Sequence, residues 1–312
     1  MKKKITVPEI MATKGSDKKV SMVACYDFMS ATLVNLSKVD MILVGDSLGM
    51  NMLGMKGTVG VTVDDMIYHI KNVVKGAPET FVVGDMPFGA YNGSIEKAVE
   101  NATRIFAEGG CDCVKMEGGM NTVPYIAAVV KAGIPVMGHI GLTPQTSAMM
   151  GGFKVQGKST AAADFLVETA KAVEKAGAFL INLEGIPSGV AKKITETLTI
   201  PTMGIGAGPH CDSQDLVWPD IMGINDFTVQ YTMLPVKSSL PMTLTLELLV
   251  NGESFSRTYT TPLTPPNSLL AAGNSYLFRA IIDENSLTFA NVSVKEWTEV
   301  DESGNPLYPI QD

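Results

Sequence analysis

The chain has 312 residues, of which 46% are hydrophobic and 18% are charged, and its net charge is −8. These values are ordinary for a soluble globular protein that is large enough for one barrel or for two domains. The excess of acid argues against nucleic acid or an anionic membrane as the main partner, because phosphate binding needs a basic face. We therefore expect small-molecule ligands, no nucleic acid and no membrane.

The start of the chain is basic, but no apolar segment follows it. We therefore expect no signal peptide and a cytoplasmic location. The four cysteines form no C-x-x-C pair, so neither a zinc ribbon nor a thioredoxin-type redox site is indicated. Free, buried thiols in a reducing compartment are the expectation.

Between Val20 and Asp220 the sequence alternates apolar, strand-like runs with helical patterns. The predicted strands are 20–27, 41–47, 80–86, 111–118, 135–141, 178–185, 200–207 and 215–220. Strict alternation of eight strands and helices predicts a (β/α)8 TIM barrel. An open, doubly wound sheet is the alternative.

The character of the chain changes near residue 226. Of the thirty glycines, twenty-seven lie in residues 1–226. Beyond that point apolar and polar residues alternate, as in 242–248, which is typical of antiparallel strands. We therefore expect a catalytic barrel over 1–226 and a small all-β, sandwich-like C-terminal domain over 227–312.

Three acids close apolar strands: Asp46, Asp85 and Glu117. A single acid at such a place is often only a helix cap or turn residue. In a barrel, however, the carboxyl ends of the strands meet at one mouth, and three carboxylates there need a cation or protons. Oxygen ligands suit Mg²⁺, so these residues predict a catalytic magnesium site.

Three more residues at strand ends carry candidate chemistry. Lys115 shares a strand face with Glu117 and has three candidate roles: charge compensation, binding of a substrate carboxylate, or a Schiff base. Glu184 ends a later apolar strand, and we expect it across the mouth from the three acids, as a general base. His139 is expected near metal or substrate, with a satisfied core histidine as the alternative.

Two loops leave their roles open. The glycines of 204–208 follow the seventh strand, where barrels can bind phosphate, although glycines also simply make tight turns. The basic segment 151–158 is either a lid over the mouth or an ordinary loop.

Over residues 3–225 the chain resembles the ketopantoate hydroxymethyltransferase family. The motifs that carry this resemblance are Ala24–Asp27, Val44–Met50, Gly84–Phe88, Val114–Gly119, Gly138–Gln145, Gly152–Gly157, Leu183–Glu184 and Gly204–Gly208. They occur in the order of the family and are specific. The resemblance implies a (β/α)8 barrel, a homo-oligomer, and transfer of a hydroxymethyl group from 5,10-methylenetetrahydrofolate to 3-methyl-2-oxobutanoate.

The resemblance also implies roles for single residues. Asp46, Asp85 and Glu117 would bind magnesium, and Glu184 would accept the proton. The 2-oxoacid would contact the four side chains Asp46, Ser47, Asp85 and Lys115. His139 is a further candidate for substrate binding, because it ends a neighbouring strand.

The chain departs from the family in three places. The usual terminal helices are replaced by the β-patterned tail, which resembles Bacteroidetes fimbrillin-like domains around Val292–Trp297. Ser213 and Asp215 stand where the family has glycine and an apolar residue. Two alternatives to the transferase therefore stay open: an inactive barrel remnant fused to a surface or adhesion domain, and a Schiff-base aldolase that uses Lys115.

Overall fold

The computed structural model describes residues 3–37 and 39–216 in full. It also describes the backbone of Val217 and of residues 240–250, 253–263, 274–282 and 287–296. The chain divides into two compact units, one with the N-terminal barrel and one with the later strands. The predicted domain boundary at residue 226 lies outside the described residues.

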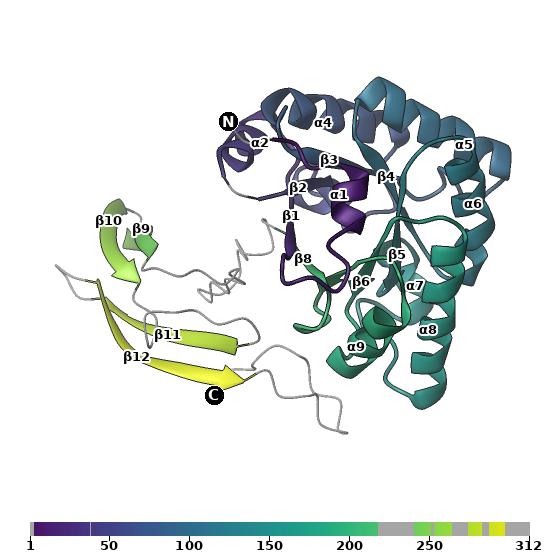
Figure 1. Ribbon diagram of the computed structural model, residues 1–312. Helices are drawn as coiled ribbons and strands as arrows, with labels where there is room; N and C mark the ends of the chain where they lie inside the picture. The colour runs from purple at the N-terminus through teal and green to yellow at the C-terminus, as the bar shows by residue number, and fades with distance from the viewer. Residues whose placement is uncertain are drawn as a thin grey trace. The chain divides into compact units, whose positions relative to one another are not determined.

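Eight parallel strands form a closed barrel (Figure 1). They are β1 (Val20–Ala24), β2 (Met41–Val44), β3 (Phe81–Asp85), β4 (Cys113–Glu117), β5 (Val136–Gly141), β6 (Leu180–Glu184), β7 (Thr202–Ile205) and β8 (Ser213–Val217). Strand β1 pairs with β8 over five residue pairs, which closes the sheet. The predicted barrel is confirmed and the open sheet is wrong.

Helices cover the outside of the barrel (Figure 1). They are α2 (Phe28–Leu36), α3 (Leu48–Asn51), α4 (Val63–Gly76), α5 (Ile95–Thr103) with the π-helical turn η1 (Arg104–Glu108), α6 (Val123–Lys131), α7 (Ser147–Met150), α8 (Thr160–Lys175) and α9 (Ser188–Thr197). Short 3₁₀ turns η2 (Met120–Thr122) and η3 (Pro144–Thr146) precede α6 and α7. Within the described ranges, no helix is long and apolar enough to span a membrane.

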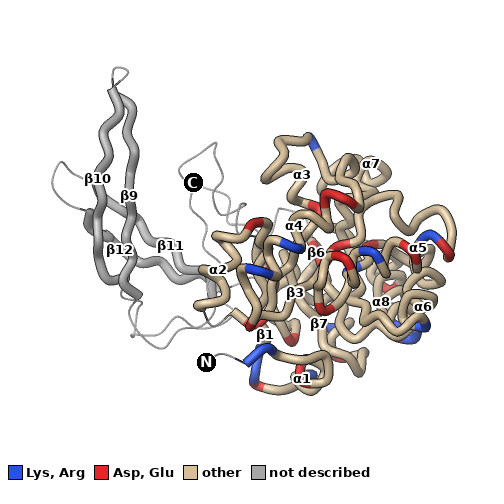
Figure 2. Tube along the Cα trace, turned by 90° about the horizontal axis from the view of Figure 1, so that it is seen from above, with Lys and Arg blue, Asp and Glu red and all other residues tan. Residues whose placement is uncertain are grey.

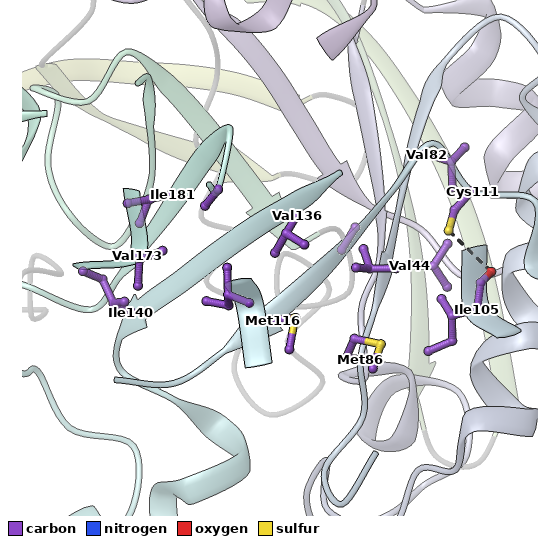
Figure 3. Packing of buried hydrophobic residues seen from close by; sticks show 14 of the residues in the cluster. Val44, Val82, Met86, Ile105, Cys111, Met116, Val136, Ile140, Val173 and Ile181 are labelled. Atoms are coloured by element: carbon purple, nitrogen blue, oxygen red, sulfur yellow. Dashed lines mark hydrogen bonds between the residues drawn. The ribbon is translucent and has the colours of Figure 1, made fainter. Parts of the chain in front are cut away.

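Successive residues of each strand point to opposite sides, so the barrel has two apolar layers. Inside it, residues from every second strand position pack together, among them Met22, Leu43 and Val83. On the outside, Val136 and Ile181 pack with Val173 of α8 (Figure 3). Burial on both faces explains why the strands read as unbroken apolar runs.

The N-terminal segment closes the end of the barrel opposite the strand C-termini. Ile10 of α1 (Val7–Met11) is fully buried in the interior cluster with Val20, the first residue of β1. Lys4 Nζ lies 2.8 Å from Asp112 Oδ2, just before β4. Lys14 Nζ lies 3.0 Å from Asp212 Oδ2, just before β8. With this end closed, the other end is left for ligands.

The later strands form two separate antiparallel pairs. One sheet pairs β9 (Leu240–Val250) with β10 (Glu253–Leu263), and the other pairs β11 (Asn274–Ile282) with β12 (Leu287–Glu296). The antiparallel strand pairing predicted for the tail is confirmed for residues 240–250, 253–263, 274–282 and 287–296.

Candidate active site

The three acids predicted to share a site lie at neighbouring strand ends. Asp46 follows β2 directly, Asp85 ends β3 and Glu117 ends β4. All three are buried, with exposed fractions of 4%, 1% and 4%. Because β2, β3 and β4 are adjacent in the barrel, the sheet itself gathers these carboxyl groups at the mouth.

A buried lysine partly neutralises this cluster. Lys115 Nζ lies 2.8 Å from Asp85 Oδ2, which also accepts a 3.2 Å hydrogen bond from the backbone N–H of Asp46. Burial raises the pKa of Asp85, although Lys115 opposes the shift. Burial raises the pKa of Asp46 well above its usual range, and the Asp85 charge adds to this. Burial lowers the pKa of Lys115, but the neighbouring carboxylates raise it by more. The net pKa is raised, so the ammonium group stays charged.

Gln145 holds two of the acids in place, and sequence reasoning gave it no role. Its Nε2 donates to Asp46 Oδ2 and to the carbonyl oxygen of Met86, both at 2.9 Å. Its backbone N–H donates to Glu117 Oε1 at 2.8 Å. The only available signal was its place at the end of the motif that begins with Gly138.

Tyr91 contacts both Glu117 and Gln145, and sequence reasoning gave it no role either. The hydroxyl lies 2.7 Å from the carbonyl oxygen of Glu117 and 2.8 Å from Gln145 Oε1. Burial raises the pKa of this fully buried phenol well above its usual value, so it stays protonated as a donor. Tyr91 lies in a loop after β3 without a recognisable motif, so its sequence carried no signal.

His139 links Glu117 to the proposed base. Its Nδ1 lies 3.3 Å from Glu117 Oε2, and its Nε2 lies 3.0 Å from Glu184 Oε2. Burial and Lys115 lower the pKa of this ring, but the two carboxylates outweigh them and raise it to about 9. His139 therefore lies between two acids, and its Nδ1 is also 3.4 Å from Lys115 Nζ.

Glu184 ends β6, which lies opposite β2 in the closed barrel, so Glu184 is across the mouth from Asp46. Its link to the acid cluster runs through His139, which stands between Glu184 and Glu117. The side chain of Glu184 is 23% exposed, whereas the carboxylates of Asp46, Asp85 and Glu117 are buried. Glycine at position 141 lets the backbones of β5 and β6 lie close together here, because a β-carbon at this position would meet the carbonyl oxygen of Glu184.

Ser47 lies at the edge of the cluster, beside a tyrosine. The Ser47 Oγ and the Tyr26 hydroxyl are 2.8 Å apart, and Asn51 Nδ2 donates to the same hydroxyl at 3.1 Å. His69 Nδ1 lies 2.6 Å from the carbonyl oxygen of Tyr26, which gives that histidine a structural role. Ser47 is thus held near Asp46 with its direction fixed by Tyr26.

The donor atoms fit magnesium in chemical type, but they are engaged with protein groups. Within residues 3–37 and 39–217, no three His, Cys, Asp or Glu side chains are arranged around a common ion position. The oxygens face Lys115, Gln145 and His139 instead. One oxygen, Asp85 Oδ1, is buried and has no hydrogen-bond partner in the described structure.

A second polar layer lies deeper in the barrel. Asp215 of β8 is 2% exposed, and its Oδ2 accepts a 3.4 Å hydrogen bond from Asn182 Nδ2 of β6. Its Oδ1, Asn182 Oδ1 and Ser213 Oγ are buried without a partner in the described part of the chain. Strand β8 begins at Ser213, two residues before the predicted start. Ser213 and Asp215 pair with Val20 and Met22, which belong to the interior cluster, so both side chains point into the barrel.

The two loops with open roles border the mouth. The backbone N–H of Gln156 donates to the carbonyl oxygen of Gly185 at 2.8 Å, which ties segment 151–158 to the loop after β6. Gly206 and Gly208 have φ values of 58° and 74°, so the turn after β7 requires glycine for its backbone. Lid closure and phosphate binding stay predictions.

Comparison with known proteins gives two family matches on one chain. The family model described as ketopantoate hydroxymethyltransferase matches residues 4–237. A family model described as fimbrillin-like matches residues 219–300. Both resemblances expected from the sequence are confirmed.

Curated relatives agree with the first match. The chain is 56% identical over 226 residues to 3-methyl-2-oxobutanoate hydroxymethyltransferase from Heliobacterium modesticaldum, covering 72% of this chain and 82% of the relative. It is 48% identical over 236 residues to the protein of the same name from Moorella thermoacetica, covering 74% and 88%.

Solved structures confirm the fold. A 2,3-dimethylmalate lyase of the PEP mutase/isocitrate lyase superfamily matches with a TM-score of 0.51 and 18% identity, over 69% of this chain and 81% of that one. Phosphonopyruvate hydrolase matches with a TM-score of 0.52 and 12% identity, over 69% and 80%. At these identities the likeness concerns the barrel architecture alone. From the family model and the curated relatives together, the chain belongs to the ketopantoate hydroxymethyltransferase family and is an enzyme of that family.

Proposed function

We propose that the barrel transfers a hydroxymethyl group from 5,10-methylenetetrahydrofolate to 3-methyl-2-oxobutanoate, giving 2-dehydropantoate for pantothenate biosynthesis in the cytoplasm. The observation that carries this proposal is the position of Glu184. Its carboxylate is partly exposed, and His139 joins it to Glu117 of the buried acid cluster. A base at the edge of a charged cluster is what removal of a proton next to a keto group needs.

Asp46, Asp85 and Glu117 are the residues that would hold Mg²⁺. Three carboxylates suit a hard dication, and the unpartnered Asp85 Oδ1 offers it a free ligand atom. When bound, the ion polarises the oxoacid oxygens and makes the C3 proton more acidic.

The chain's own residues supply the remaining chemistry. Lys115 and Ser47 would bind and orient the oxoacid, with Lys115 stabilising negative charge that develops on the keto oxygen. Glu184 would take the proton from C3, and His139 would hold the Glu184 carboxylate in place. Gln145 fixes the side chain of Asp46 and keeps its direction constant.

The transfer balances with water as its one further reagent. The electron pair left on C3 forms a bond to the one-carbon unit, whose bonds to the folate nitrogens break. Water supplies the new hydroxyl oxygen. The C3 proton, released by Glu184, and a water proton end on the two nitrogens of tetrahydrofolate.

The proposal is tested by exchange of the C3 proton of 3-methyl-2-oxobutanoate in D₂O without folate. Exchange should require Mg²⁺ and should fall by at least about 100-fold in Glu184→Gln, the usual size of a general-base contribution. Glu196→Gln, at an exposed position of α9, is the matched control. Undiminished exchange in Glu184→Gln would show that another group is the base.

The charge of Lys115 argues against the Schiff-base aldolase. A lysine that attacks a carbonyl needs a lowered pKa, so that the neutral amine is available. The neighbouring carboxylates raise the pKa of Lys115, and its ammonium group is paired with Asp85. Borohydride with substrate should therefore trap no adduct at Lys115.

The closed barrel supports an active enzyme over the alternative of an inactive remnant. Ser213 and Asp215 lie within the register that joins β8 to β1. We propose that residues 227–312 form a separate β domain and that the barrel self-associates, with no nucleic-acid or membrane partner. Acidic and basic residues are interspersed along the barrel trace (Figure 2), in keeping with this.

A further inference from the structure

Three buried oxygen atoms inside the barrel lack hydrogen-bond partners in the described part of the chain. They are Asp215 Oδ1 and Ser213 Oγ of β8 and Asn182 Oδ1 of β6. Each of the three residues is at most 3% exposed, so bulk water does not reach these atoms. An unpaired buried polar atom destabilises a fold, and an unpaired buried carboxylate does so most. We therefore expect a bound partner for these oxygens.

The three side chains point into the same part of the barrel interior. Ser213 and Asp215 occupy alternate positions of β8, so their side chains lie on one face of that strand. Met203 of β7 pairs with both Ser213 and Asn182, so the two polar strands flank a single strand. Asp215 Oδ2 lies 3.4 Å from Asn182 Nδ2, and the unpartnered oxygen of each group is bonded to the same carbon as the atom in this contact. This contact favours one small ligand between β6 and β8 over separate partners.

Neighbouring charges leave Asp215 without a cation of its own in the described structure. Three charged side chains act on it from other strands: Lys115 of β4, His139 of β5 and Glu184 of β6. Lys115 Nζ is already paired with Asp85 at 2.8 Å, and His139 Nε2 lies 3.0 Å from Glu184. The adjoining strands β1 and β7 place methionines of the interior cluster beside this layer. An ionised Asp215 therefore needs a positive charge from outside the chain.

We propose that Asp215, Asn182 and Ser213 form a binding site for a small monovalent cation such as K⁺ or Na⁺. All three unpartnered atoms are oxygens, which are the ligands that hard cations prefer. One carboxylate balances one positive charge, whereas a divalent ion would need a second carboxylate to balance its charge. The site lies below the acids of the mouth and is independent of the reaction proposed for them. Because Ser213 and Asp215 depart from the family pattern, it is a property of this chain.

A proton and the cation compete for Asp215. Burial raises the pKa of this carboxyl group to about 7. Below that pH the group keeps its proton, and the site has no net charge to attract an ion. Above that pH the carboxylate is ionised, and a bound cation offsets the free-energy penalty of burying its charge. Cation binding should therefore be weak at pH 5 and strong at pH 8.

Thermal unfolding of the full-length protein in EDTA, followed by calorimetry, tests the site. At pH 8 the Tm should rise with KCl or NaCl and then level off, relative to choline chloride at the same ionic strength. At ten times the dissociation constant, a bound ligand favours the folded state about elevenfold, which corresponds to a rise of about 3–6 °C. At pH 5 the potassium and choline salts should give the same Tm.

Two variants separate the charge from the neutral ligands. Asp215→Asn removes the charge and should abolish the difference between KCl and choline chloride at pH 8. Ser213→Ala keeps the charge but removes one oxygen, so the same rise in Tm should need about tenfold more KCl. Asp17→Asn removes an exposed carboxylate and is the matched control, which should respond to KCl as wild type does.

A wild-type Tm that is equal in potassium and choline salts at pH 8 would overturn the proposal, since internal water or Lys115 would then satisfy the carboxylate. A potassium effect that persists in Asp215→Asn would overturn it too, because the ion would bind elsewhere. An effect of the same size at pH 5 and pH 8 would contradict the competition with a proton. Crystals grown in RbCl at pH 8 give a direct check. The anomalous signal of rubidium should appear between Asp215 and Asn182, and density there without that signal would mark a water molecule and rule out the ion.

Discussion

Asp215 is a carboxyl group inside a barrel whose interior is otherwise largely apolar below the mouth. Its carboxyl group accepts a long hydrogen bond from Asn182 at Oδ2, and Oδ1 is unpartnered in the described structure. Burial raises the pKa of Asp215 to about 7 from an ordinary value of 3.8. Between about pH 4 and pH 7 the carboxyl group of Asp215 therefore keeps its proton in the folded protein, whereas the same group has lost it in the unfolded chain.

This shift predicts how stability depends on pH. Because the folded-state pKa is raised, folding is favoured most when Asp215 is protonated, and the stability is lost as the pH rises from about 4 to about 7. A shift of this size corresponds to at most about 4 kcal/mol. Asp215→Asn should remove that part of the pH dependence, measured by urea unfolding at pH 5 and pH 8.

Asp17→Asn, at an exposed position, is the control for this experiment. It should leave the pH dependence of unfolding as in wild type. If Asp215→Asn and wild type lose the same stability between the two pH values, Asp215 is already ionised or otherwise stabilised in the folded state.

At the scale of elements, the N-terminal helix α1 closes the end of the barrel where the strands begin. Ile10 is fully buried in the interior cluster, whereas its neighbour Met11 is 42% exposed. The ion pairs of Lys4 and Lys14 hold the segment against the starts of β4 and β8. The N-terminal segment is thus tied to β4 and to β8, which lie on different sides of the barrel.

Ile10→Ala should lower the free energy of unfolding by about 2–5 kcal/mol, the range for truncating a buried isoleucine to alanine. Met11→Ala offers a matched comparison on the adjacent residue and should cost well under 1 kcal/mol. Chemical denaturation measures both. Equal effects would mean that α1 is not packed into the barrel end in solution.

Elements also show where sequence patterns are informative. Seven strands lie within their predicted ranges because apolar runs closed by polar or glycine residues mark them. The start of the eighth strand was predicted two residues too late, at residue 215, because its first residues, Ser213 and Gln214, are polar. Backbone pairing with β1 and β7 decides its start, and no local pattern carries that information.

On the scale of the whole molecule, the barrel is complete before the tail begins. Strand β8 ends at Val217, and its five pairs with β1 already close the sheet. The two units are compact separately. The chemistry proposed for the mouth uses residues between Asp46 and Glu184, and none from the tail.

A protein that ends at residue 226 should therefore keep Mg²⁺-dependent C3 exchange within a few-fold of the full chain. It should also keep the self-association expected from the family, which sedimentation velocity measures. If the shortened protein folds by circular dichroism but loses exchange, the tail contributes to the site and the independence of the two domains is wrong.

By itself the sequence determined the alternation of strands and helices, the change of character near residue 226, and the acids at the strand ends. Those features are local, because a periodic pattern and a turn signal are both written in neighbouring residues. Only the tertiary structure decided which side chains meet. Gln145 reaches Asp46 across 99 positions of the chain, and His139 joins Glu117 to Glu184. Such contacts depend on barrel closure and on loop paths, which bring distant residues within hydrogen-bond distance without leaving a pattern in either segment.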